Sequence, residues 1–216
     1  MKWFCVITSI MLLCSCESRN EPMPTTTAAP VQTESVEAPA EQPARPQVKK
    51  TKPASQAFFD AALHGDIETV ESELKAGVDV NATSVNGQKQ TALMLAAFNG
   101  HRNLVEMLIA HGGKVNHLDV THRTALMYCC SGPFPETAQL LLDHGADVNI
   151  IDNNEKWTAL MFAAAEGQVE NVKILLKYGA DWKLTDIDGD TAASFAAKNG
   201  HQQVAQIIEE HAKSNP

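Results

Sequence analysis

The four residues TALM stand at Thr91–Met94, return at Thr124–Met127 and return again at Thr158–Met161. A weaker copy, TAAS, begins at Thr191, so successive copies start 33 or 34 residues apart. A fixed period of this size is typical of repeat proteins, in which one supersecondary unit is stacked on the next. The sequence around TALM therefore decides the fold.

Each copy opens a unit with two short helical patterns. The first pattern begins at a threonine suited to cap a helix and ends near a glycine such as Gly100 or Gly167. The second carries apolar residues at helical spacing, for example Leu104, Val105 and Leu108. Polar stretches with hairpin-turn chemistry, such as VNGQ and DIDGD, separate the units. No unit can bury its apolar face alone, so the units must stack.

These residues resemble the ankyrin repeat, whose pattern is close to D-x-x-G-x-T-P-L-H-x-A-A-x-x-G-H, followed by an apolar helix and G-A-D-V-N. The closure GADVN stands at Gly145–Asn149, with near copies at Gly77–Asn81 and Gly112–Asn116. The resemblance implies an all-α repeat solenoid of about five stacked ankyrin repeats, each a helix-turn-helix with a β-hairpin loop. The expected repeat domain is 55–213, with repeats at 55–81, 82–116, 117–149, 150–182 and 183–212.

The sequence departs from the family pattern at several positions. Alanine replaces the proline and methionine replaces the histidine after each capping threonine, as in Ala92 and Met94. The third unit carries Cys129–Cys130 in place of the alanine pair and then two prolines around Phe134. We therefore expect a distorted turn between the helices of that unit, which Phe134 either plugs or leaves to contact a partner. The first unit lacks its threonine.

The N-terminus has a different composition. Lys2 precedes a ten-residue apolar run, Phe4–Leu13, of the length of a signal-peptide core. The following LCSC resembles the bacterial lipobox and implies cleavage before Cys16, which would carry the lipid. Residues 1–15 are then a lipoprotein signal peptide, and 16–54 a lipidated, Pro/Thr/Ala-rich disordered linker. Glu17 after the cysteine favours the outer membrane. The alternative is an uncleaved hydrophobic N-terminus.

The charge excludes some partners. The chain has a net charge of −9, and residues 55–216 hold 21 acidic against 11 basic residues. Nucleic-acid binding needs a basic stripe, so we expect no nucleic acid. The same excess of acids would be repelled by an anionic membrane surface, so we expect membrane contact only through the N-terminal lipid.

The sequence holds no motif of catalytic chemistry. It contains no Cys-x-x-Cys pair, no His-Glu-x-x-His and no glycine-rich phosphate loop. We predict no enzyme activity, no cofactor and no metal site. A calcium loop at Asp186, Asp188 and Asp190 is a weak alternative, because the distal glutamate of an EF-hand is missing. Cys129 and Cys130 are interpreted as small buried residues, with a redox-active pair as the alternative.

Function must then lie on an exposed surface. In ankyrin-like arrays the concave face is formed by hairpin tips and the ends of the first helices. The residue types that dominate binding, Trp, Tyr and Arg, occur among these positions. The predicted partner-binding residues are Trp157, Phe98, Tyr178, Arg123, Val85, Asn86, Val120, Asn154, Glu166 and His111. For Trp157, the alternative is that it folds onto its own hairpin.

The sequence-based hypothesis is a membrane-anchored periplasmic scaffold for protein–protein interaction, with an unknown protein bound on the concave face. An immunity or accessory role for an exported toxin or phospholipase is its first elaboration. The alternative is an oxidative-stress protection factor that acts through Cys129, Cys130 and the methionines as oxidisable groups.

Overall fold

The computed structural model describes residues 52–215, and the predicted signal peptide, Cys16 and nearly all of the linker lie outside them. The described residues form ten α-helices. Their bounds are α1 Gln56–His64, α2 Ile67–Lys75, α3 Ala92–Phe98, α4 Arg102–Ala110, α5 Ala125–Cys130, α6 Pro135–Asp143, α7 Ala159–Ala165, α8 Val169–Lys177, α9 Ala192–Lys198 and α10 Gln202–Ser214.

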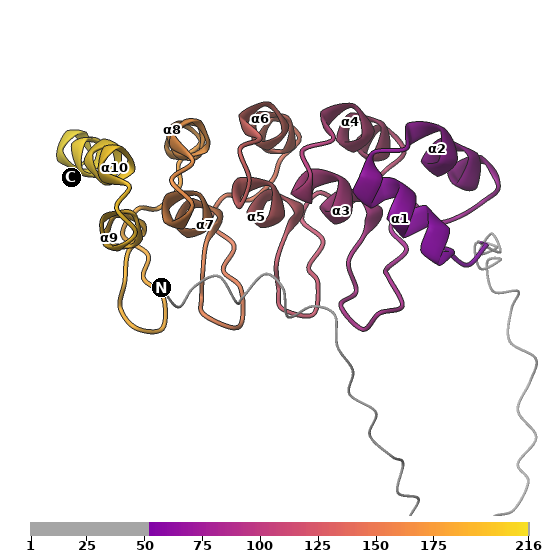
Figure 1. Ribbon diagram of the computed structural model, residues 1–216, viewed down its shortest axis with the longest axis horizontal. Coiled ribbons are helices and arrows are strands. Elements are labelled where there is room, and N and C mark those ends of the chain that lie inside the picture. Colours follow the sequence, from indigo (N-terminus) through magenta and orange to yellow (C-terminus); the bar gives the residue numbers. More distant parts are fainter. Residues whose placement is uncertain (1–51, 216) are drawn as a thin grey trace, which may run out of the picture. The chain divides into compact units, whose positions relative to one another are not determined.

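The helices form five antiparallel pairs in two rows. The first helices of the pairs (α1, α3, α5, α7 and α9) lie side by side, and the second helices form a parallel row behind them (Figure 1). The loops between pairs project beyond the first helices, away from the second row (Figure 1). We call these loops fingers 1 to 4, residues 82–90, 117–123, 150–157 and 184–190. The predicted all-α repeat solenoid is confirmed.

Each capping threonine starts a first helix as the sequence predicted. The hydroxyls of Thr91, Thr124 and Thr158 each accept a hydrogen bond, at 3.3 Å, from the backbone N–H three residues on. Such a cap satisfies one of the helix's unpaired donors and stabilises the fold by about 1 kcal/mol. In the first unit Ser55 takes the place of the threonine. Its hydroxyl caps α1 by accepting a hydrogen bond from the backbone N–H of Phe58.

The core lies between the two rows of helices. The leucine and methionine of each TALM copy are buried, and the alanine pairs of α3 and α7 have no exposed surface. Cys129 and Cys130 occupy the same two positions in α5 and are equally buried. Small side chains at these positions let adjacent first helices pack closely, about 8–10 Å apart. The repeated letters reflect a repeated interface.

An asparagine ladder joins successive units. Asn116 donates from its amide to the carbonyl of Gly145 at 2.9 Å and accepts from the N–H of Asp147 at 2.9 Å. Asn81 and Asn149 make the same pair of bonds one unit before and one unit after. These bonds explain the final letter of the G-A-D-V-N closure. In the fourth unit Lys183 replaces this asparagine. The fifth unit ends with α10, which is 13 residues long and is not followed by a G-A-D-V-N closure.

The turn of the third unit differs from its neighbours, as the prolines predicted. In the other turns a glycine adopts positive φ, for example +68° at Gly100, whereas Gly132 does not. Phe134 is half-buried and its ring lies against both Gly100 and Gly132. Phe134 therefore plugs the turn. Pro135 occupies the first turn of α6, where its missing N–H costs nothing.

Candidate protein-interaction face

The four fingers form one continuous row. The N–H of Val120 donates to the carbonyl of Gln88 at 3.1 Å, which joins finger 2 to finger 1. Asn153 donates to Thr121 at 3.0 Å, and Ile187 donates to Glu155 at 3.1 Å. Each finger is thus fixed to the next by a backbone hydrogen bond. The finger tips present a single surface rather than four independent loops.

A buried acceptor organises each finger from inside. The carboxylate of Asp152 accepts from the N–H groups of Glu155 and Trp157, at 3.0 and 3.1 Å. Asp119 and Asp186 accept two backbone N–H bonds in the same way. In finger 1 the hydroxyl of Ser84 accepts from Gln90. Asp186 therefore serves as the turn acceptor of the DIDGD loop, whereas Asp190 accepts from the hydroxyl of Ser194 and pairs with Lys198.

The residues before Thr91, Thr124 and Thr158 reach into the following unit. Gln90 donates to the hydroxyl of Tyr128 at 2.9 Å, and Tyr128 donates in turn to Asp119 at 2.7 Å. Burial, together with this bond to the carboxylate, raises the pKa of Tyr128 well above its usual value of 10. The phenol stays neutral and keeps its donor.

Arg123 and Trp157, which precede Thr124 and Thr158, make the corresponding contacts in the next two units. Arg123 lies over the ring of Phe162, 5.1 Å from its centroid, and donates to the buried carboxylate of Asp152 at 3.2 Å. Trp157 packs against Phe162 and Phe195, with ring centroids 5.0 and 4.6 Å apart. Such ring pairs add about 0.5–1.5 kcal/mol beyond their buried area.

We call Phe98, Tyr128, Trp157, Phe162 and Phe195 the aromatic strip; their ring contacts form two groups, one of Phe98 and Tyr128 and one of Phe162, Trp157 and Phe195. Phe98 meets Tyr128 edge to face at 6.1 Å. Phe98 is 38% exposed, three members are half-buried, and Phe195 is buried. A half-buried aromatic floor can fix units to one another and still offer apolar surface to a partner.

Exposed apolar side chains line the fingers beside this strip. Of the seven large apolar residues exposed in the described part of the chain, five lie in fingers: Val85, Leu118, Val120, Ile151 and Ile187. Val85 is 81% exposed and Ile187 is 53% exposed, although both are apolar. Five of the seven exposed large apolar residues of the described chain thus gather in the fingers rather than on the second helices.

The structure brings most of the predicted residues onto this face. Val85, Asn86, Val120, Arg123, Asn154 and Trp157 lie in the fingers, Phe98 ends α3, and Glu166 follows α7. Trp157 packs on the first-helix rings rather than on the tip of its own finger.

Two predicted residues lie elsewhere. His111 and Tyr178 follow α4 and α8, at the ends of second helices. The hydroxyl of Tyr178 bonds Gln139 and Asp143 of α6, and the bond to Asp143 raises the pKa of Tyr178. Its contact thus joins two second helices, so the structure does not bring Tyr178 together with the aromatic strip.

Sequence reasoning missed three members of the strip, Tyr128, Phe162 and Phe195. The signal was present, because each is the fifth residue counted from a capping threonine: TALMY, TALMF and TAASF. Leu95 holds the corresponding place in the second unit. The fifth residue varies between the copies and places a different side chain on this face in each unit.

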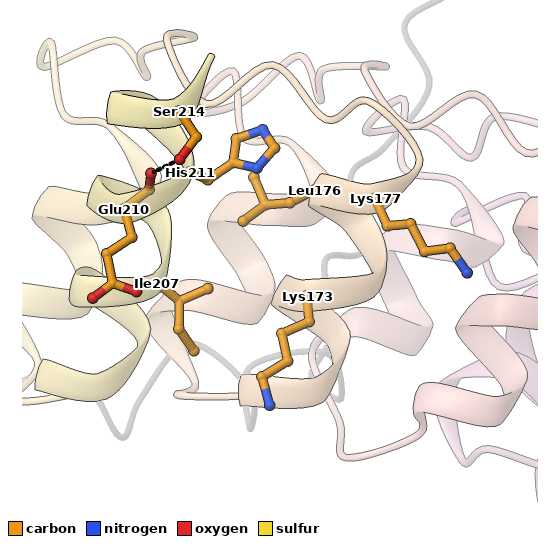
Figure 2. Close-up of a pocket in the computed structure, with 7 residues that line it drawn as sticks. All are labelled: Lys173, Leu176, Lys177, Ile207, Glu210, His211 and Ser214. Atoms are coloured by element: carbon orange, nitrogen blue, oxygen red, sulfur yellow. Dashed lines mark hydrogen bonds between the residues drawn. The ribbon is translucent and has the colours of Figure 1, made fainter. Parts of the chain in front are cut away.

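The rest of the described chain offers less. A shallow hollow of about 390 Å³ lies between α8 and α10, with Leu176 and Ile207 at its floor and Lys173, Lys177 and His211 around them (Figure 2). It belongs to the second-helix row and collects none of the predicted contacts. Within residues 52–215, no cluster of three or more His, Cys, Asp or Glu side chains could hold a metal ion. No helix in that range has the length and apolarity to cross a membrane.

The two cysteines are in a setting unsuited to thiol reactions. Neither has exposed surface, and burial raises the pKa of both thiols. The thiolate is the reactive species, so these thiols are poor nucleophiles and poor redox sensors. The Cys129 thiol lies 3.4 Å from the carbonyl oxygen of Phe134. This geometry fits their interpretation as small core residues.

Stacked helix pairs with a row of fingers and an aromatic floor define a repeat scaffold whose surface suits another protein. Comparison with known families agrees. A family model described as ankyrin repeats in three copies matches residues 58–152, and a second, for ankyrin repeats in many copies, matches 141–196. The chain belongs to the ankyrin repeat family. Proteins built from these repeats are generally non-enzymatic scaffolds that bind protein partners.

Individual relatives share the repeats but are much longer. The "Ankyrin repeat and KH domain-containing protein mask-1" of Caenorhabditis elegans is 35% identical over 112 residues, which is 52% of this chain and 4% of that protein. "Tyrosine-protein kinase HTK16" of Hydra vulgaris is 31% identical over 167 residues, 73% of this chain and 22% of that protein. Inversin of Gallus gallus is 29% identical over 133 residues, 62% and 11% respectively. This chain therefore spans less than a quarter of each relative.

Proposed function

We propose that the protein is a lipid-anchored scaffold that binds one partner protein along its fingers and aromatic strip. The observation that carries this proposal is the exposure of Val85 and Ile187, at 81% and 53%, beside a half-buried aromatic floor. Covering exposed apolar side chains with a partner removes their surface from water, which favours binding by about 25 cal/mol per Å². The second-helix row has a single large apolar residue of this kind, Ile67, within the described residues.

The anchor is the second part of the proposal. The apolar run Phe4–Leu13 and the sequence LCSC support export and lipidation at Cys16 in a bacterial cell. Residues 16–54 then form a linker between the lipid and the repeat domain at 55–213. The proposed location is the outer membrane, with the repeats facing the periplasm. An immunity or accessory role toward an exported toxin or phospholipase is the finer form of this proposal.

Capture on the immobilised full chain tests the interaction. The bait is compared with a variant carrying Val85→Asp and Ile187→Asp, and with a control carrying Glu106→Lys and Lys177→Glu on the second helices. All four positions are exposed, so each variant is expected to fold, which circular dichroism checks. A partner retained by wild type and control but lost from the finger variant supports the proposal. Loss from the control instead would place binding on the second-helix row.

The anchor has its own test. Growth with an alkyne analogue of palmitate should label the wild-type chain and not a Cys16→Ser variant, which should also leave the membrane fraction. Equal labelling of the two chains, or none of either, would remove the lipid anchor from the proposal. Neither result bears on the finger surface, so the two parts of the proposal fail separately.

A further inference from the structure

Three consecutive fingers hold a residue with a side chain in a backbone conformation that favours glycine. Lys89, His122 and Lys156 have φ values of +54°, +60° and +59°. Each stands two residues before its capping threonine, where finger 4 has Gly189 at +85°. The left-handed region is unfavourable for residues that carry a Cβ. We call Lys89, His122 and Lys156 the cationic row, after its two lysines.

The fold itself does not call for these side chains. A Cβ built on Gly189 meets nothing within 4 Å, so this place in the finger is open space. Glycine in fingers 1 to 3 would therefore keep the turn and remove the strain. Strain held where the fold does not require it points to a role at a binding surface. Glycine at these places would lose the ammonium groups of Lys89 and Lys156 and the imidazole of His122.

The surroundings leave the side chains of the row available to a ligand. All three side chains are exposed, and among residues 52–215 no ion pair includes Lys89, His122 or Lys156. Two of the three acids in fingers 1 to 3, Asp119 and Asp152, are buried and bonded to finger backbone.

Glu155 is the one exposed acid of these three fingers. The exposed lysines of these fingers, Lys89 and Lys156, thus outnumber the exposed acids in a domain that is otherwise acidic. Exposed Val85 and Val120 lie in the same fingers. A matching ligand would carry carboxylates with apolar groups among them.

The spacing of the row indicates the shape of that ligand. Neighbouring packed helices lie about 8–10 Å apart, and the fingers follow the same repeat. A polyproline-II segment returns to the same face every three residues and advances about 9 Å in doing so. Acidic residues three apart in an extended segment therefore match one finger each.

From this row we infer that the fingers bind an extended acidic segment of a partner protein. The segment lies across fingers 1 to 3, with one carboxylate toward each member of the cationic row and apolar side chains against Val85 and Val120. The inference rests on the proposed function, since it names the chemistry of the partner at the same face. It commits to a peptide-like segment and not to a lipid or nucleic acid.

The test uses three fluorescent twelve-residue peptides and the purified full chain, with binding followed by anisotropy. The first peptide has glutamate at every third position with proline and leucine between, the second has the same composition with its glutamates contiguous, and the third has lysine for glutamate. The periodic acidic peptide should bind tightest and the lysine peptide should not bind. Raising the salt from 0.05 to about 0.5 M should weaken binding, since these charges are exposed.

Glycine variants separate binding from folding. Lys89→Gly and Lys156→Gly should each weaken binding about two- to fivefold, as expected for exposed charge pairs, and together about tenfold. The thermal midpoint of neither variant should fall, because glycine relieves the strain. Lys177→Gln, an exposed lysine on α8, is the matched control and should bind like wild type.

Equal binding of the lysine peptide, or full affinity of the double glycine variant, would overturn the inference. So would failure of the periodic peptide to bind. If that failure accompanies capture of a partner lost from the Val85→Asp/Ile187→Asp variant, the proposed function stands and only the acidic segment is wrong. If neither peptide nor partner binds, both fall.

Discussion

Gly100 offers the sharpest test of how the units pack. It lies between α3 and α4 at φ +68°, and a Cβ there would come within 2.1 Å of Phe134 Cδ1 and 2.4 Å of Cγ. Gly100→Ala therefore adds overpacking, about 1–3 kcal/mol, to left-handed backbone strain of about 1–2 kcal/mol. The sum is a loss of about 2–5 kcal/mol in the free energy of unfolding.

Gly145→Ala is the matched control. Gly145 has φ +83°, but its Cβ would meet nothing within 4 Å. This variant should lose only the strain, about 1–2 kcal/mol. The difference between the two variants isolates the contact with Phe134.

Urea unfolding followed by far-ultraviolet circular dichroism gives both losses. Gly100→Ala is then repeated in a Phe134→Ala background, where the clash is gone and the loss should shrink to that of Gly145→Ala. If Gly100→Ala costs no more than Gly145→Ala in the wild-type background, the plug formed by Phe134 is not as described. An unchanged loss in the Phe134→Ala background would refute it equally.

Three further predictions follow from the described contacts. Arg123→Ala should lower the free energy of unfolding by about 1–3 kcal/mol in urea titrations, because it leaves the buried carboxylate of Asp152 without its charged partner. As a control, Lys173→Ala removes an exposed ion pair with Glu170 and should cost at most about 1 kcal/mol. Desolvation lowers the pKa of His117 below its usual 6.5, so the unfolded chain binds the proton more readily and stability should fall as the pH drops through 6.5. Between pH 7.5 and 5 the thermal midpoint should fall less in His117→Gln than in wild type, and an equal fall in both would contradict this. Cys129 and Cys130 should resist a thiol reagent in the native chain and react after denaturation; rapid native labelling would revive the redox hypothesis.

The sequence predicted the parts of the fold that repeat. The period of TALM, the capping threonines and the closure at Gly145–Asn149 each constrain the same helix pair independently, so the solenoid followed from them. The distorted turn of the third unit followed from two prolines that cannot continue the regular turn, but the sequence left open whether Phe134 plugs that turn. The cap of the first helix was missed because Ser55 does not stand where the other units place their threonine.

The binding face was harder to predict because it depends on contacts between units. The residue type of Trp157 predicts a contact with a partner, but its rings meet Phe162 and Phe195 and hold two units together. Tyr178 looked like a face residue in sequence, yet its hydroxyl turns to α6. The positive φ of Lys89, His122 and Lys156 had a signature in the sequence, because each stands at the glycine of the D-x-x-G-x-T pattern, two residues before a capping threonine.

Site-specific photo-crosslinking in living cells tests the central claim most directly, that the fingers are the face that binds a protein. A photoreactive amino acid replaces Val85 or Ile187 in the fingers, and Glu106 or Lys177 on the second helices. All four positions are exposed, so the fold is kept. The account predicts one defined adduct from both finger positions and none from the second helices. Adducts from the second helices alone, or none from the fingers, would contradict it.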